Sequence, residues 1–137
     1  MLNKVLLCLL CFSLFSSTLL ADEEVTEQSQ NVYLYFLIEP DIVTNYVTSG
    51  KKIGFVRISV ELVVRTQENY ALIEAHAPLI RDRIITIFGE QTARKVKSVT
   101  ERDGIRQRCI TELNALLFAE TAKKPITDLL FTKYLYQ

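Results

Sequence analysis

IGFVRISVELVVR, residues 53–65, alternates apolar and polar side chains through its central part, residues 56–62. One face carries five apolar residues, Val56, Ile58, Val60, Leu62 and Val64. The opposite face carries Arg57, Ser59, Glu61 and Arg65. A period of two residues predicts a long strand with one buried and one solvated face, which is typical of an antiparallel sheet that helices cover on one side.

Two further strand-like runs precede this stretch. NVYLYFLIEP, residues 31–40, alternates its apolar side chains and ends at Pro40, which cannot donate to a sheet ladder. DIVTNYV, residues 41–47, is a second short run, and residues 48–51 have the composition of a turn. We therefore expect three strands before the first helix.

The period changes to about 3.6 residues after residue 66. Tyr70, Ile73 and Ile80 share one face of a helix that continues to Phe88. Pro78 lies inside this pattern, so we expect a kink or a break there.

A short helical turn is expected after Thr92, and a second long helix from about residue 100. Residues 126–137, ITDLLFTKYLYQ, close the chain as a strand. The expected order is β-β-β-α-α-α-β. This order describes an α+β domain: a mostly antiparallel sheet with two to three helices packed on one face.

The first 31 residues differ in composition from the rest of the chain. Residues 1–21 combine Lys4, an apolar run and a small residue, Ala21, and predict a signal peptide or a membrane anchor. Residues 22–31 are acidic and polar and read as a linker. Residues 32–137 are then the folded domain, and both interpretations place it outside the cytoplasm.

Composition argues against several classes of function. The 16 basic residues balance the 16 acidic ones, which gives no basic face for nucleic acid. One histidine, His76, and one cysteine beyond residue 21, Cys109, are too few for a zinc site. We expect no catalytic residue, no cofactor and no metal, and we expect Cys109 to be buried on the inner face of the second long helix.

Four stretches together resemble the flagellar basal-body-associated FliL family. YFLIEPDIVTNYV (35–47) is similar to the family's opening, and FVRISVELVVR (55–65) to its central strand. HAPLIRDRIITIFGEQTA (76–93) resembles its most recognisable stretch, and DLLFTKYLYQ (128–137) its ending. The resemblance covers nearly all of residues 32–137, in order.

The resemblance implies a stomatin/prohibitin-like domain in the periplasm, associated with the inner membrane and the flagellar basal body. Such a domain is expected to form homo-oligomers or rings and to contact the stator units, without enzymatic activity. Pro78, Arg81 and Asp82 match the family motif and are the candidate interaction surface, with the charged turn projecting outward. The alternative for these three residues is a helix kink followed by a solvated turn.

The sequence also departs from the family pattern. The residues before the apolar segment number only four, and the linker has about ten residues where the family has an extended one. These departures are consistent with a divergent paralogue. The alternative function is a stomatin-like periplasmic scaffold that serves another membrane complex.

The N-terminal interpretation predicts cleavage after Ala21, because the apolar run is short and small polar residues follow it. Mass spectrometry of the protein recovered from membranes should find a chain that begins at Asp22. An intact Met1 in the inner-membrane fraction would support an anchor instead.

Overall fold

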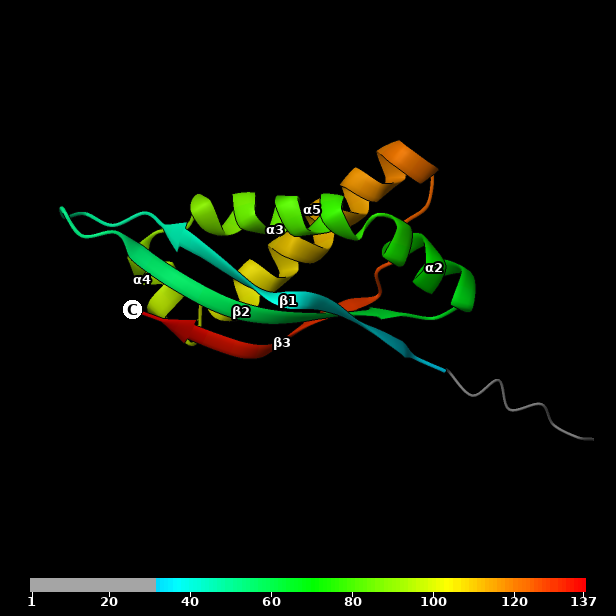
Figure 1. Cartoon of the computed structure of the whole chain (residues 1–137), viewed down its shortest axis with the longest axis horizontal. Helices are drawn as coiled ribbons and strands as arrows, with labels where there is room; N and C mark the ends of the chain where they lie inside the picture. The colour runs from blue at the N-terminus through cyan, green and yellow to red at the C-terminus, as the bar shows by residue number, and fades with distance from the viewer. Residues whose placement is uncertain (1–31) are drawn as a thin grey trace, which may run out of the picture.

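The structure is a computed structural model that describes residues 32–137. Its elements are β1 (Leu34–Tyr46), β2 (Gly54–Val64), α2 (Gln67–Ala75), α3 (Ala77–Gly89), α4 (Ala93–Lys97), α5 (Arg102–Thr121) and β3 (Asp128–Tyr136). The strands form one antiparallel sheet in the order β1-β2-β3, and α3 and α5 lie on the same face of it (Figure 1). The expected α+β class is confirmed, whereas the predicted N-terminal segment and linker lie outside the described residues.

The hydrophobic core lies between the inner face of the sheet and the helices. The five apolar residues on the inner face of β2 are each at most 1% exposed. Above them, α3 contributes Ile80, Ile84, Ile87 and Phe88, and α5 contributes Ile105, Cys109, Leu113 and Leu117. The alternation of residues 53–65 thus identified the buried face correctly.

The expectation of two separate strands before residue 48 is wrong. β1 is one strand of 13 residues that pairs with β2 along its length. Its register shifts between Ile38 and Ile42, and the Glu39–Pro40 peptide bond, which is cis, lies within this irregularity. Pro40 is tolerated there because β1 is an edge strand, where a residue without an N–H group can face away from the ladder.

The expected interruption of the first helix is a full break. α2 ends at Ala75, and His76 leaves helical geometry with φ −107° and ψ 11° before α3 begins at Ala77. Pro78 occupies the first turn of α3, where its missing N–H group would have no intrahelical partner in any case. The short helix expected after Thr92 is α4, and the strand expected over residues 126–137 is β3.

Cys109 is buried, as expected. Its side chain is 0% exposed, and burial raises the pKa of its thiol to about 12. The residue therefore acts as a small apolar core group.

The β1–β2 hairpin requires a glycine at position 54. Tyr46 is 2% exposed, and its hydroxyl donates a hydrogen bond of 2.7 Å to the backbone carbonyl of Gln137. A Cβ atom at Gly54 would lie 2.3 Å from the Tyr46 ring. Only glycine lets the ring pack across the end of β2 and hold the end of β3 in place.

Gly54→Ala should therefore destabilise the domain by about 1–3 kcal/mol, because the buried Tyr46 ring must move. Gly50→Ala is the matched control in the same hairpin, since a Cβ atom there meets nothing within 4 Å. Urea unfolding of both variants measures the difference. Equal stability of the two variants would show that Tyr46 adjusts without loss of packing.

Candidate interaction surface

Pro78, Arg81 and Asp82 lie in the first two turns of α3, next to the break that separates it from α2. The break is held by His76, whose backbone N–H contacts the Ile73 carbonyl at 3.1 Å. Pro78 and Asp82 are exposed, and their spacing of four residues places them on one face of the helix. Arg81 is only partly exposed.

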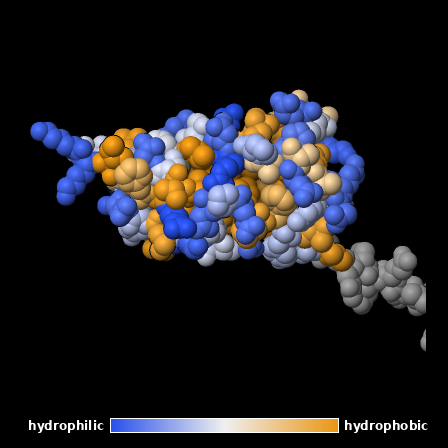
Figure 2. Space-filling view, in the orientation of Figure 1, coloured by the Kyte–Doolittle hydropathy of each residue, from blue (hydrophilic) through white to orange (hydrophobic). Residues whose placement is uncertain are grey.

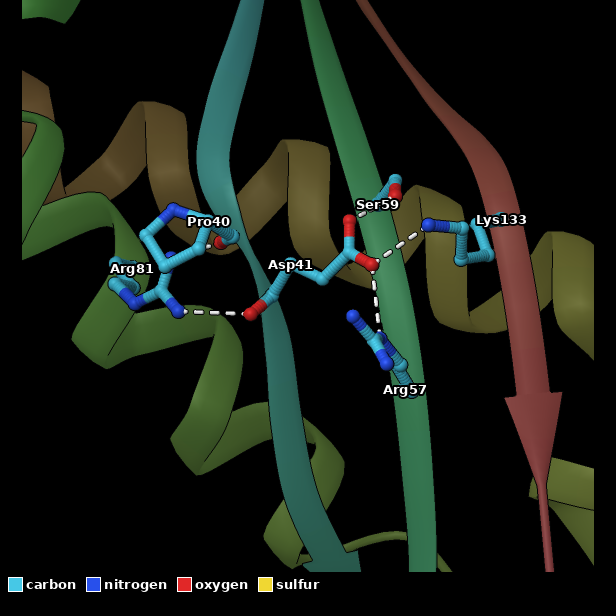
Figure 3. Close-up of polar contacts among 6 residues, drawn as sticks. All are labelled: Pro40, Asp41, Arg57, Ser59, Arg81 and Lys133. Carbon is cyan, nitrogen blue, oxygen red and sulfur yellow. Dashed lines mark hydrogen bonds and ion pairs between the residues drawn. The ribbon is translucent and has the colours of Figure 1, made fainter.

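The expectation that the charged turn projects outward is wrong for Arg81, whose side chain points toward β1 (Figure 3). Its guanidinium donates to the backbone carbonyl of Pro40 at 2.6 Å and to that of Asp41 at 3.0 Å. These carbonyls lie where the strand register shifts. Arg81 therefore fixes the start of α3 to the edge of the sheet, which the sequence alone did not indicate.

Asp41 connects all three strands on the outer face of the sheet (Figure 3). Its carboxylate accepts hydrogen bonds from Arg57 Nε at 2.9 Å, from Lys133 Nζ at 2.7 Å and from the Ser59 hydroxyl. The alternation of apolar and polar residues in the stretch 53–65 correctly predicted that Arg57 and Ser59 lie on this face. Nothing in the sequence indicated Asp41 or Lys133 as their partners, because each contact joins a different strand.

The Asp41 side chain is 18% exposed, less than its basic partners. The hydrogen bonds from Lys133, Ser59 and Arg57 hold the pKa of this carboxyl well below its ordinary range, and they outweigh the partial burial that raises it. A carboxylate with a lowered pKa remains charged and is a poor proton acceptor. The cluster is therefore suited to joining the strands and not to acid–base chemistry.

A groove runs beside β1 at the α2–α3 junction, with a volume of about 580 Å³. It is lined by residues 35–39 of β1 and by Tyr70, Ala77, Pro78 and Arg81 of the two helices. Figure 2 shows hydrophobic and hydrophilic residues interspersed on the face of the molecule turned toward the viewer. Pro78 thus lies beside β1, an edge strand that, within residues 32–137, has β2 as its strand partner.

Two further findings concern residues 32–137 alone. No group of three or more His, Cys, Asp or Glu side chains in this range is arranged to hold a metal ion. No helix in the same range combines the length and the hydropathy needed to cross a bilayer.

The lowered pKa of Asp41 predicts an acid-sensitive contribution to stability. A carboxyl whose pKa falls on folding stabilises the domain above its unfolded value of about 3.9, and this contribution is lost as the pH falls below that value. Asp41→Asn should therefore be less stable than the parent at pH 7 and should lose less stability between pH 5 and pH 2.

Urea unfolding across this pH range measures the effect, with Asp82→Asn as a control, since Asp82 is exposed and forms no ion pair within residues 32–137. An Asp41→Asn profile parallel to that of the parent would show that the carboxylate contributes nothing through its charge.

The family described as "Flagellar basal body-associated protein FliL" matches this chain over residues 35–137. A flagellar protein FliL from Aquifex aeolicus is 22% identical to it over 106 residues, which cover 77% of this chain and 63% of that protein. This chain thus aligns with less than two thirds of the length of its relative. Because the family match extends from the start of β1 to the last residue of the chain, the protein belongs to the FliL family of flagellar basal body-associated proteins.

Proposed function

We propose that this protein acts at the flagellar motor, where its domain self-assembles and contacts the stator units or the basal body to support torque generation and motility. Its domain lies in the periplasm, held at or near the inner membrane. Family membership supports the association with the basal body. The protein acts through protein contacts and not as an enzyme.

The observation that carries this proposal is the α2–α3 junction. Pro78 is exposed there and lines an open groove. Asp82 is exposed one turn further along α3. Arg81 holds this junction against β1 through the Pro40 and Asp41 carbonyls, so the exposed pair is presented in a fixed position.

Pro78 and Asp82 are therefore the contact residues in this proposal, and Arg81 positions them. Exposed charges at such a surface set the register and the rate of association more than its affinity. A near-neutral domain also has no strong electrostatic attraction to unrelated partners.

Asp82→Arg tests the proposal. The variant should keep its stability within about 0.5 kcal/mol, because the residue is exposed and forms no ion pair within residues 32–137. It should nevertheless reduce recruitment to flagellar bases, followed by fluorescence of a tagged copy, and shrink the swimming zone in soft agar.

Glu120→Arg is the matched control, because Glu120 is equally exposed but lies in the last turn of α5. Arg81→Ala is the structural comparison and should lower stability by about 1–2 kcal/mol through two unpaired carbonyls. If Asp82→Arg is recruited and swims like the parent, this face is not the motor contact. If the parent itself lies in the membrane away from flagellar bases, the alternative, a stomatin-like scaffold for another complex, replaces the proposal.

A further inference from the structure

The three-stranded sheet has two edges, β1 and β3, and both are partly open. The β1 edge is closed at two places: Arg81 occupies the Pro40 and Asp41 carbonyls, and Val47 exchanges backbone hydrogen bonds of 2.8 Å with Gln91 and Ala93. Residues 34–38 have β2 as their backbone partner and no other among the described residues. An uncovered strand edge is a template for pairing with another chain.

The β3 edge is open at the corresponding position. β3 pairs with β2 on one side, and no described residue pairs with its backbone on the other side. The Asp128 carboxylate accepts a hydrogen bond of 2.7 Å from the Leu129 N–H, so the free backbone begins beyond it, at Leu130 and Phe131. Both edges of the molecule therefore offer unpaired strand backbone.

The two open segments lie opposite each other across β2, in the same register. Leu37 of β1 pairs with Glu61 of β2, and Glu61 pairs in turn with Leu130 of β3. The next inward-facing row joins Ile38, Val60 and Phe131 in the same way. β1 and β3 are both antiparallel to β2 and so run in the same direction, which keeps the segments matched along their length.

We propose that copies of this chain associate edge to edge, with β3 of one copy extending the sheet of the next along residues 34–38 of β1. This inference rests on the self-assembly in the proposed function and assigns its surface. A contact between two different edges is heterologous, so it continues from copy to copy and forms a ring or a filament.

Side chains support this pairing on both faces of the sheet. On the outer face, Leu37 is 42% exposed and Leu130 is 37% exposed, and the joined sheet would place them side by side. On the helix face, the groove lined by Tyr70 and Pro78 would meet a groove of about 300 Å³ beside β3, which Val99 and Phe131 line. Each edge therefore supplies apolar surface that the other can cover.

The charges at the two edges are complementary. The β1 side presents Asp82, which is exposed and forms no ion pair within residues 32–137. The β3 side presents Arg102, whose guanidinium lies 4.1 Å from the centre of the Tyr134 ring and lines the β3 groove. The Arg102 Nε atom has no hydrogen-bond partner among the described residues. That Nε atom is buried, so it is not itself a contact for another chain. Arg102 forms no ion pair within residues 32–137, and in the joined sheet its charge would lie opposite Asp82 of a second copy.

Cysteine pairs test the geometry in the full-length protein in its own membrane. In one copy, Leu37 and Leu130 are two strand spacings apart, about 9–10 Å, which exceeds the limit of about 7 Å for a disulfide. Between copies they would be one spacing apart, about 4.8 Å, which is within the permitted range. Mild oxidation of the variant with both Leu37→Cys and Leu130→Cys should therefore give a ladder of dimers, trimers and larger species.

The controls use a background with Cys8→Ser and Cys11→Ser, while Cys109 is left in place because it is buried. Each single variant should remain monomeric on a denaturing gel. The pair Val43→Cys and Leu130→Cys should give no ladder, because Val43 pairs with Arg57, four residues from Glu61 along β2, or about 13 Å away. Val43 is 59% exposed, so lack of access would not explain that result.

Four outcomes would overturn the pairing. A dimer formed by Leu37→Cys alone would show that two β1 edges meet, and an equal ladder from the Val43 control would show random collision. If the parent chain is oligomeric by native sizing but the matched pair gives no ladder, assembly uses another surface, and the proposed self-assembly stands.

A parent chain that is monomeric at every concentration removes self-assembly itself. Recruitment to the flagellar base then decides the rest of the proposed function.

Charge reversal provides a second, independent readout in the matched cysteine background. Asp82→Arg or Arg102→Glu alone should lower the yield of the ladder, and the two changes together should restore it. Thermal unfolding of each variant shows whether the domain remains folded. A folded double variant with a yield no higher than that of the single variants would remove this ion pair from the interface.

Discussion

The structure depends on covering the inner face of a narrow sheet. β2 is hydrogen-bonded on both sides, and its five inner residues are almost completely buried beneath α3 and α5. The apolar face of a sheet must be buried against another layer, and in this domain α3 and α5 form that layer. The long run of helices between β2 and β3 provides this cover, and it places the last strand on the far side of β2 from the first.

The register shift in β1, at Pro40 and Asp41, links the outer face of the sheet to the helices. There the Asp41 side chain joins three strands through Arg57, Ser59 and Lys133, while the Pro40 and Asp41 carbonyls accept hydrogen bonds from Arg81 of α3. One short segment of backbone thus holds the strands and the first turns of α3 in a fixed relation. The exposed Pro78 and Asp82 take their positions from this network, which explains how a surface motif can depend on groups on both sides of a sheet.

The same architecture determines which surfaces of the domain remain open. Helices cover the inner face, the polar outer network engages its own charges, and the strand backbone left unpaired within residues 32–137 lies at the two sheet edges. Backbone at an open strand edge, with apolar grooves beside it, can bind another protein segment. The contacts that we propose for this member of the FliL family therefore lie at the rim of the domain.

The sequence by itself determined the strand of residues 53–65, its buried face, the break before Pro78, the burial of Cys109 and the α+β class, because each follows from local periodicity or from the chemistry of one residue. It also carried the four stretches that identify the family. Only the tertiary structure decided that residues 34–46 form one strand, since Pro40 is acceptable in a strand only at an edge, and strand order is not local information. Likewise the direction of Arg81 and the partners of Asp41 depend on segments 16 to 92 residues away, and no local pattern of side chains specifies contacts over such separations.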